Sequence, residues 1–182
     1  MTIESGLPTA RSTAADWSSE AKLFAVSMQI DWPLAVDPQS PIAVAPGGWI
    51  AYTFFRPDGT DGAQETLSLF YERTSGVLAQ QREVAWPQDE AVTPLDPMEL
   101  PISSASAIIA VEAREGLAWR SACPVNRHLT RVSLTANRDA SAAWVVTYAD
   151  ATIDPAGLLA HVDAQRGEIT RLDLRTDECA PE

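Results

Sequence analysis

Four arginines and a histidine lie close together in the sequence, in a stretch without any acidic residue. They are Arg120, Arg127, His128, Arg131 and Arg138. The guanidinium group of arginine presents a planar set of donors that matches a carboxylate or phosphate. This stretch could therefore hold an anionic ligand or a carboxylate-bearing partner. The same side chains could instead pair with the acidic residues of segment 87–101.

Nucleophilic catalysis would require a cysteine or serine beside a histidine. Cys123 and His128 are five positions apart in a proline-containing stretch, a spacing that matches no catalytic motif, and catalytic pairs are normally assembled by the fold. We therefore interpret Cys123 as structural and His128 as a surface residue. His161 falls in an expected strand, at a position that corresponds to an aromatic residue of the first half, which favours a packing role.

Neither a metal nor a cofactor is predicted. The two histidines and two cysteines lack the C-x-x-C or H-x-x-x-H spacing of a zinc site. Residues 56–62 lack the alternating oxygen ligands and the distant glutamate of a calcium loop, and there is no phosphate-binding glycine motif. Two cysteines are too few for a disulfide framework, although a bond between Cys123 and Cys179 stays open.

Composition limits the kinds of partner. The 182 residues are 46% hydrophobic, enough for one domain or two small ones. The formal charge of −12 disfavours nucleic acid and anionic membranes and favours a basic protein as partner, unless the charge serves only solubility. The sequence has no apolar run of roughly 18–20 residues and no signal-like N-terminus, so we expect a cytoplasmic protein. Its oligomeric state stays open.

The elements that would position these residues follow from periodicity and turn residues. We expect residues 1–14 to be flexible and a helix to cover Asp16–Gln29, where Ala21, Phe24, Ala25 and Met28 recur at helical spacing. A second helix should run from Ser103 or Ser104 to about Ala118, with Gly116 as its stop signal. Between the helices lies a proline-rich acidic linker, 87–101. The expected strands are Trp49–Phe55, Thr66–Glu72, Val77–Val84, Leu129–Thr135, Trp144–Tyr148, Leu158–Val162 and Ile169–Leu174.

The two halves of the chain, 15–86 and 102–178, are weakly similar to one another. Three matches occur in the same order, namely Ser18-Ser19 with Ser103-Ser104, Trp49-Ile50 with Trp144-Val145, and Leu67–Leu78 with Leu158–Ile169. We interpret this order as a duplication. It predicts that Trp49 and Trp144 occupy equivalent strand positions.

The second half also resembles PepSY-like and related cystatin-like domains. The resemblance rests on an aromatic strand, Trp144–Tyr148, followed by V-D-x-x-x-G-E-I at Val162–Ile169. In the first half, Glu72–Val77 keeps only the acid and the glycine. The resemblance implies a helix packed on a curved sheet, in a non-catalytic module that binds or restrains peptidases and other proteins.

These observations predict an α+β protein of two tandem cystatin-like halves, each a helix followed by an antiparallel sheet of three or four strands. The expected function is non-catalytic protein binding, of an inhibitor or immunity type. The alternative is an enzyme or small-ligand-binding protein with a pocket on a concave sheet face, lined by Trp49, Tyr52, Trp144, Tyr148 and His161. A shallow apolar groove or a closed core would favour the first.

Overall fold

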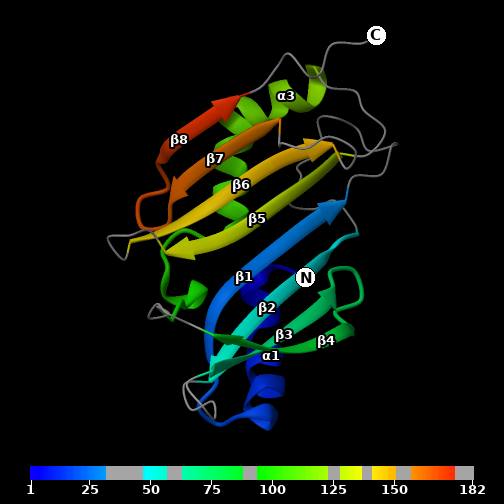
Figure 1. The fold of residues 1–182 in the computed structure, drawn as a ribbon. Coiled ribbons are helices and arrows are strands. Elements are labelled where there is room, and N and C mark those ends of the chain that lie inside the picture. The colour runs from blue at the N-terminus through cyan, green and yellow to red at the C-terminus, as the bar shows by residue number, and fades with distance from the viewer. Residues whose placement is uncertain are drawn as a thin grey trace.

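A computed structural model describes residues 1–31, 47–56, 63–87, 94–122, 128–136, 141–150 and 157–174 (Figure 1). The helical elements are α1 (Ile3–Trp17), the 3₁₀ turn η3 (Pro97–Glu99), α2 (Ser104–Val111), the π-helical turn η4 (Glu112–Gly116) and α3 (Leu117–Ala122). The strands are β1 (Lys22–Asp31), β2 (Trp49–Arg56), β3 (Ala63–Glu72), β4 (Leu78–Pro87), β5 (His128–Ala136), β6 (Ala142–Asp150), β7 (Leu158–Asp163) and β8 (Ile169–Leu174). All seven strands expected from Trp49 onward are confirmed.

The eight described strands form one antiparallel sheet in the order β4-β3-β2-β1-β5-β6-β7-β8. The expectation of two tandem cystatin-like halves, each with its own sheet, is therefore wrong. The first four strands are continued by the last four because β1 pairs with β5, where Ser27 lies opposite Ser133. A strand left at a sheet edge exposes unpaired backbone N–H and C=O groups. Pairing β1 with β5 removes two such edges and makes one continuous sheet (Figure 1).

Within this single sheet, the β3–β4 pair of the first half and the β7–β8 pair of the second half carry a bulge at the same relative position. The β3–β4 pairing shifts by one residue between Phe70 and Tyr71, and the β7–β8 pairing shifts between His161 and Val162, 91 residues later in both cases. Such bulges are local devices that bend a strand and disturb its edge. The expected match of Leu67–Leu78 with Leu158–Ile169 is thus confirmed in strand register.

The two hairpin turns are also built alike. The N–H of Gly76 donates to the carbonyl of Glu72, and the N–H of Gly167 donates to the carbonyl of Asp163, each at 2.8 Å. Both glycines have a positive φ, 69° and 75°, which costs glycine little because it has no Cβ.

The N-terminal region differs from the sequence prediction. Residues 1–14, expected to be flexible, contain most of α1, and the helix expected over Asp16–Gln29 is instead the end of α1 followed by β1. Thr2 caps α1, since its hydroxyl accepts a hydrogen bond from the N–H of Ser5 while the Ser5 hydroxyl accepts one from the Thr2 N–H. The buried side of α1 carries residues spaced three or four apart: Ile3, Leu7, Ala10 and Ala14.

The second helical region begins where the sequence predicts. The hydroxyl of Ser103 accepts a hydrogen bond from the N–H of Ser106, so Ser103 is the N-cap of α2. The prediction that Gly116 stops the helix is wrong, because the helical path continues through the π turn into α3. Gly116 lies close under Tyr148, and a Cβ atom at this position would approach the tyrosine hydroxyl to 2.8 Å.

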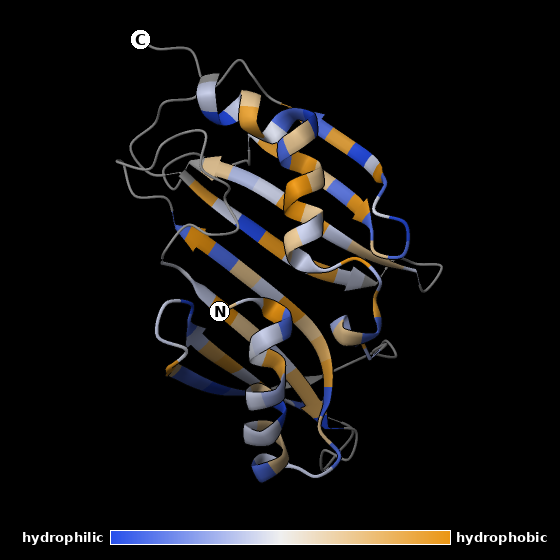
Figure 2. Ribbon diagram, turned by 180° about the vertical axis from the view of Figure 1, so that it is seen from behind, coloured by the Kyte–Doolittle hydropathy of each residue, from blue (hydrophilic) through white to orange (hydrophobic). Residues whose placement is uncertain are grey.

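Both helical regions cover the same face of the sheet (Figure 2). The core lies between them and the sheet, and its largest fully buried side chains are Trp144, Tyr52, Tyr148, Phe54, Ile3, Leu7, Ile30, Ile50, Leu67, Leu69 and Ile108. The opposite face carries smaller residues at its centre, where strand register places Ala51, Ser27, Ser133 and Val145 side by side. The sheet therefore has one closed face and one that no described helix covers.

Candidate functional site

The structure does not gather the predicted basic residues into one site. Arg120 is buried in α3, on the helix-covered side, with 9% of its surface exposed. Arg131 is exposed on β5 and lies opposite Thr147, on the other face of the sheet, where it donates to the side chain of Gln29 at 3.3 Å. His128 begins β5, and nothing is described of its side chain. Arg127 and Arg138 lie outside the described residues, as do Cys123, Cys179 and part of the linker, 88–93.

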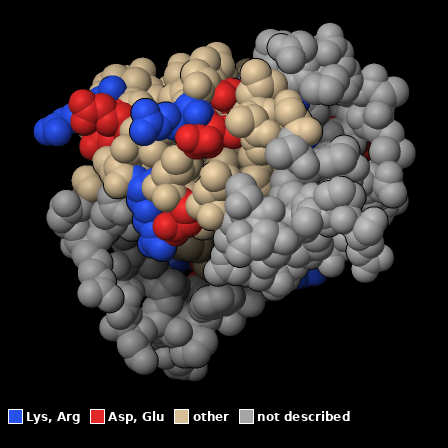
Figure 3. Space-filling view, turned by 90° about the horizontal axis from the view of Figure 1, so that it is seen from above, with Lys and Arg blue, Asp and Glu red and all other residues tan. Residues whose placement is uncertain are grey.

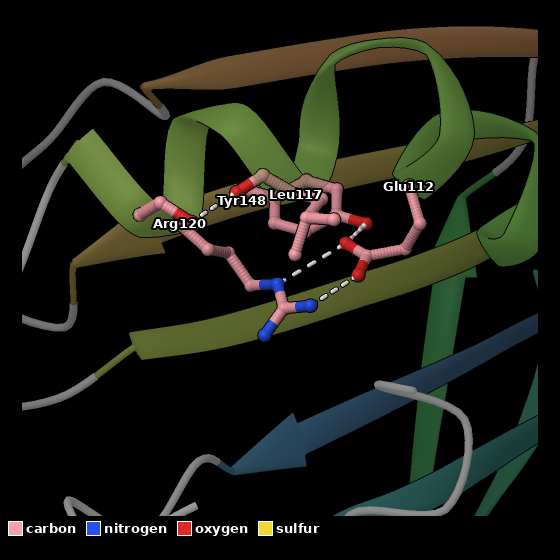
Figure 4. Close-up of polar contacts among 5 residues, drawn as sticks. Glu112, Leu117, Arg120 and Tyr148 are labelled. Carbon is pink, nitrogen blue, oxygen red and sulfur yellow. Dashed lines mark hydrogen bonds and ion pairs between the residues drawn. The ribbon is translucent and has the colours of Figure 1, made fainter. Parts of the chain in front are cut away.

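Arg120 instead forms an ion pair with Glu112, eight residues earlier (Figure 4). Its Nη2 donates to one carboxylate oxygen of Glu112, and its Nε donates to the other at 3.3 Å. The latter oxygen also accepts a hydrogen bond from the Tyr148 hydroxyl at 2.6 Å. Burial, and then the neighbouring Glu112 carboxylate, raise the pKa of Tyr148 well above its ordinary value.

This cluster fixes the helical region to the sheet. The π turn carries Glu112 and is followed directly by α3 with Arg120, while Tyr148 rises from β6. π turns are rare and are frequent at functional sites. Here the cluster is largely enclosed, since the side chains of Arg120 and Glu112 are only 6% and 14% exposed. Its geometry suits a structural anchor better than a binding site for an external anion.

The five residues of the predicted sheet-face pocket are also separated. Tyr52, Trp144 and Tyr148 belong to the closed core under the helices. The Tyr52 hydroxyl donates to a backbone carbonyl of α1 at 2.7 Å, and the Trp144 indole N–H donates to the carbonyl that precedes the N-cap of α2, also at 2.7 Å. Trp49 and His161 are half-buried and lie on the opposite face.

Strand register explains why Trp49 and Trp144 differ. Ile50 lies opposite Tyr71, and Trp144 lies opposite Val162, which is 91 residues after Tyr71. Trp144 therefore corresponds to Ile50, and the predicted equivalence with Trp49 is wrong by one residue. A shift of one residue along a strand moves a side chain to the other face of the sheet.

A hollow on the surface lies between α2 and the edge strand β8. It has a volume of about 580 Å³ and is lined by Ala110, Ala113, Arg114 and the run Gly167–Leu172. Two large apolar side chains are exposed in the elements that border it, Ile109 on α2 (57% exposed) and Leu174 on β8 (42%). We call this hollow the α2–β8 groove. The sequence features that could have indicated this groove are the small side chains of α2 and the short final strand.

The α2–β8 groove carries charges of both signs. Arg114 and Arg171 line it together with Glu168, and Arg171 is paired with Asp173 at 2.6 Å. Basic and acidic side chains stand side by side on the end of the molecule where β8 and α3 lie in Figure 1 (Figure 3). The groove is therefore mixed in charge, and it is open along the sheet edge.

The described residues contain no group of three or more His, Cys, Asp or Glu side chains placed to hold a metal ion. No helix within the described part of the chain is both long enough and apolar enough to cross a membrane.

The elements define an α+β protein whose single eight-stranded antiparallel sheet carries helices on one face. A crystal structure named as that of a "putative lipoprotein" from Clostridium difficile 630 is similar, with a TM-score of 0.52 and 11% identity over 92% of this chain and 91% of that one. At this identity the likeness shows a shared fold alone. No protein-family model matches the chain, and a search of curated proteins also gives no match. The resemblance to PepSY-like domains stays a prediction.

Proposed function

We propose that this protein is a non-catalytic module that binds another protein, of the inhibitor or immunity type. The observation that carries the proposal is the α2–β8 groove beside the edge strand β8. The aromatic residues that could have lined a sheet-face pocket, Tyr52, Trp144 and Tyr148, lie in a closed core instead. A closed core together with an open groove at the sheet edge favours protein binding over a reaction pocket.

An extended segment of the partner is the occupant that suits this groove. No described strand pairs with the outer side of β8, so its outward backbone groups can pair with an added strand. Every second side chain of that strand would point toward α2. The groove is lined there by the half-buried Ile169 and Leu172 and by Ala110 and Ala113, which leave room for apolar side chains.

The charge of the whole chain favours a basic partner. Mixed charges in the groove contribute little at a distance, so the net charge of −12 dominates the long-range field. The screening length falls from roughly 8 Å at physiological salt to about 3 Å at 1 M. We expect association to slow steeply as salt rises, and stopped-flow rates that do not change with salt would contradict electrostatic recruitment.

Capture of the partner from the native organism, with matched variants, tests the proposal. Ala113→Trp fills the groove, whereas Ala118→Trp places the same side chain at an exposed position on α3 that does not line it. We expect one protein that both the wild type and Ala118→Trp retain and that Ala113→Trp loses. Binding should also slow hydrogen exchange of the outward amides of β8.

Two results would reject the proposal. One is a partner retained equally by both tryptophan variants, with exchange protection elsewhere. The other is a substrate in cell extract that the protein converts.

We also propose a cytoplasmic location. The similar Clostridium chain is named a lipoprotein, so fractionation of the native organism is the direct test, and recovery in the membrane fraction would contradict it.

A further inference from the structure

The two edge strands of the sheet differ in the side chains that they turn toward the helices. On β4 these are Gln81 and Glu83, which lie opposite buried leucines of β3. On β8 the positions 91 residues later are Leu172 and Leu174, which lie opposite buried residues of β7. Polar and charged side chains at such positions discourage the addition of another strand. The β4 edge is therefore protected against strand addition, whereas the β8 edge offers apolar side chains to it.

The α2–β8 groove has two distinct ends. One end lies at the β7–β8 turn, where Ile102, just before α2, lies against Gly167: a Cβ atom at this glycine would be 3.1 Å from the Ile102 side chain. At the other end, Trp119 of α3 lies against Gly157, directly before the β7 residue that pairs with Leu174. The helical region thus follows β8 from its first residues to its last, and α3 lies at the Leu174 end (Figure 1).

One cation on the helical side of the groove is available to a partner. Ala110, Ala113 and Arg114 are three and four residues apart, a spacing that places them on one face of the helical region, and all three line the groove. Arg114 comes last and therefore lies toward the Leu174 end. It is exposed, and no ion pair joins it to another residue in the described part of the chain.

The other charged residues of the lining point away from the helices. Arg171 lies opposite His161 on the uncovered face and is already ion-paired there. Glu168 directly precedes Ile169, whose register with a buried residue of β7 turns it toward the helices, and successive side chains of a strand point to opposite faces. Among the described lining residues, Arg114 is thus the one charged group on the helical side.

We propose that the partner's segment runs antiparallel to β8 and carries an acidic side chain followed, two and four residues later, by apolar side chains. This inference rests on the proposed function and adds the direction and the chemistry of the bound segment. Every strand pair in the described sheet is antiparallel, and antiparallel pairs are slightly the more stable. Such a segment enters at the Leu174 end, so its acidic side chain meets Arg114. The side chains two and four residues further on then lie toward Ile169 and the small side chains of α2.

Three peptides test the pattern and the direction together. The first is acetyl-Lys-Thr-Glu-Thr-Val-Thr-Val-Thr-Lys-amide, in which the glutamate and both valines point to one side of an extended strand. The second carries the same residues in reverse order, acetyl-Lys-Thr-Val-Thr-Val-Thr-Glu-Thr-Lys-amide, and the third is the first with glutamine in place of glutamate. Because the ends are blocked, the glutamate side chain is the only negative charge. NMR titration at millimolar peptide should shift amide signals of β8 and give an affinity about tenfold higher for the first peptide than for the other two, since a charge-assisted contact is worth more than a neutral one.

Variants of the protein then locate the contacts. Arg114→Gln should lower the affinity for the first peptide by about tenfold, to the level of the glutamine peptide, and Arg114→Glu should instead prefer an analogue with lysine in place of the glutamate. Arg166→Gln is the matched control, because it removes an exposed cation of the β7–β8 turn that does not line the groove, and it should change nothing. The double variant Leu172→Gln, Leu174→Glu gives β8 the residues of β4 and should abolish binding.

Failure of this inference is distinguishable from failure of the proposed function. Equal affinity for the glutamate and glutamine peptides, equal or tighter binding of the reversed peptide, or no binding of any peptide overturns the inference. The proposed function still stands in these cases if Ala113→Trp loses a partner that Ala118→Trp retains. Dimerisation that light scattering detects in the wild type but not in the double variant also overturns the inference, because a second copy then occupies the edge. If the double variant fails to fold, judged by circular dichroism, the variants of the exposed Arg114 decide the case.

Discussion

Replacing Trp144 by alanine should be one of the most costly single changes in this chain. The side chain is fully buried, at 0% exposure, between β6 and α2. Burial of a tryptophan removes roughly 150–250 Å² from water, equivalent to about 4–6 kcal/mol at 25 cal/mol per Å². Measured truncations of buried tryptophan cost about 3–5 kcal/mol. The change also strands the carbonyl of Ile102, which accepts the indole N–H, adding about 1–3 kcal/mol.

Trp49 provides the internal comparison. It is half-buried on the uncovered face and packs edge-on against Phe70, with ring centroids 5.8 Å apart. Loss of half the burial and of one aromatic pair predicts about 1–2 kcal/mol for Trp49→Ala. Urea unfolding followed by circular dichroism measures both variants. Equal losses, or a loss below about 2 kcal/mol for Trp144→Ala, would refute the assignment of the two tryptophans to opposite faces.

Three further predictions concern the structure. Glu112→Gln should lower the free energy of unfolding by about 3–5 kcal/mol, because Arg120 is then left as a buried charge without its carboxylate; a loss below about 1 kcal/mol in urea unfolding would contradict this. The raised pKa of Tyr148 contributes stability that is present below the pKa of the tyrosine in the unfolded chain, about 10, and is lost as pH rises above it, at about 1.4 kcal/mol per pH unit. The free energy of unfolding of Tyr148→Phe should therefore fall less steeply with alkaline pH than that of the wild type. An equal dependence on pH in the two proteins would count against this prediction. Gly48→Ala should destabilise more than Gly47→Ala, although both glycines have a φ of 91°, because a Cβ atom at Gly48 would clash with the backbone oxygen of Gln29, whereas at Gly47 its nearest neighbour would be 3.7 Å away. Thermal melts that rank the two variants equally would show that backbone strain alone decides.

The strands were predictable because their signals are local. Gly76 and Gly167 each end a run of alternating residues, and turn chemistry at these glycines does not depend on the rest of the fold. The N-terminal part was not predictable in this way. Met28 belongs to a helical spacing with Phe24, yet it also alternates with Val26 and Ile30 as buried positions of β1. Both periods are present in this stretch, and only packing against neighbouring strands decides between them.

The sites show a similar division. The sequence identifies Arg120 as a candidate because of its charge. Its partner Glu112 lies in a π turn, and no local sequence pattern predicts that turn. The pairing of β1 with β5 is equally hidden, since it joins residues about a hundred positions apart. The false match of Trp49 with Trp144 arose because residue type was compared without register, and register is fixed by pairing across strands.

The β1–β5 junction also shapes how the chain must fold. Ser27 meets Ser133 only after all of the intervening chain has been made, and contacts so distant in sequence slow folding because a large loop must close first. During synthesis the first four strands can pair among themselves while β1, with its buried residues Leu23, Val26, Met28 and Ile30, still lacks its neighbour. Until β5 emerges, that side of β1 is open to strands of other chains. A mutation that delays β5 should therefore raise aggregation during expression more than it lowers the stability of the finished protein.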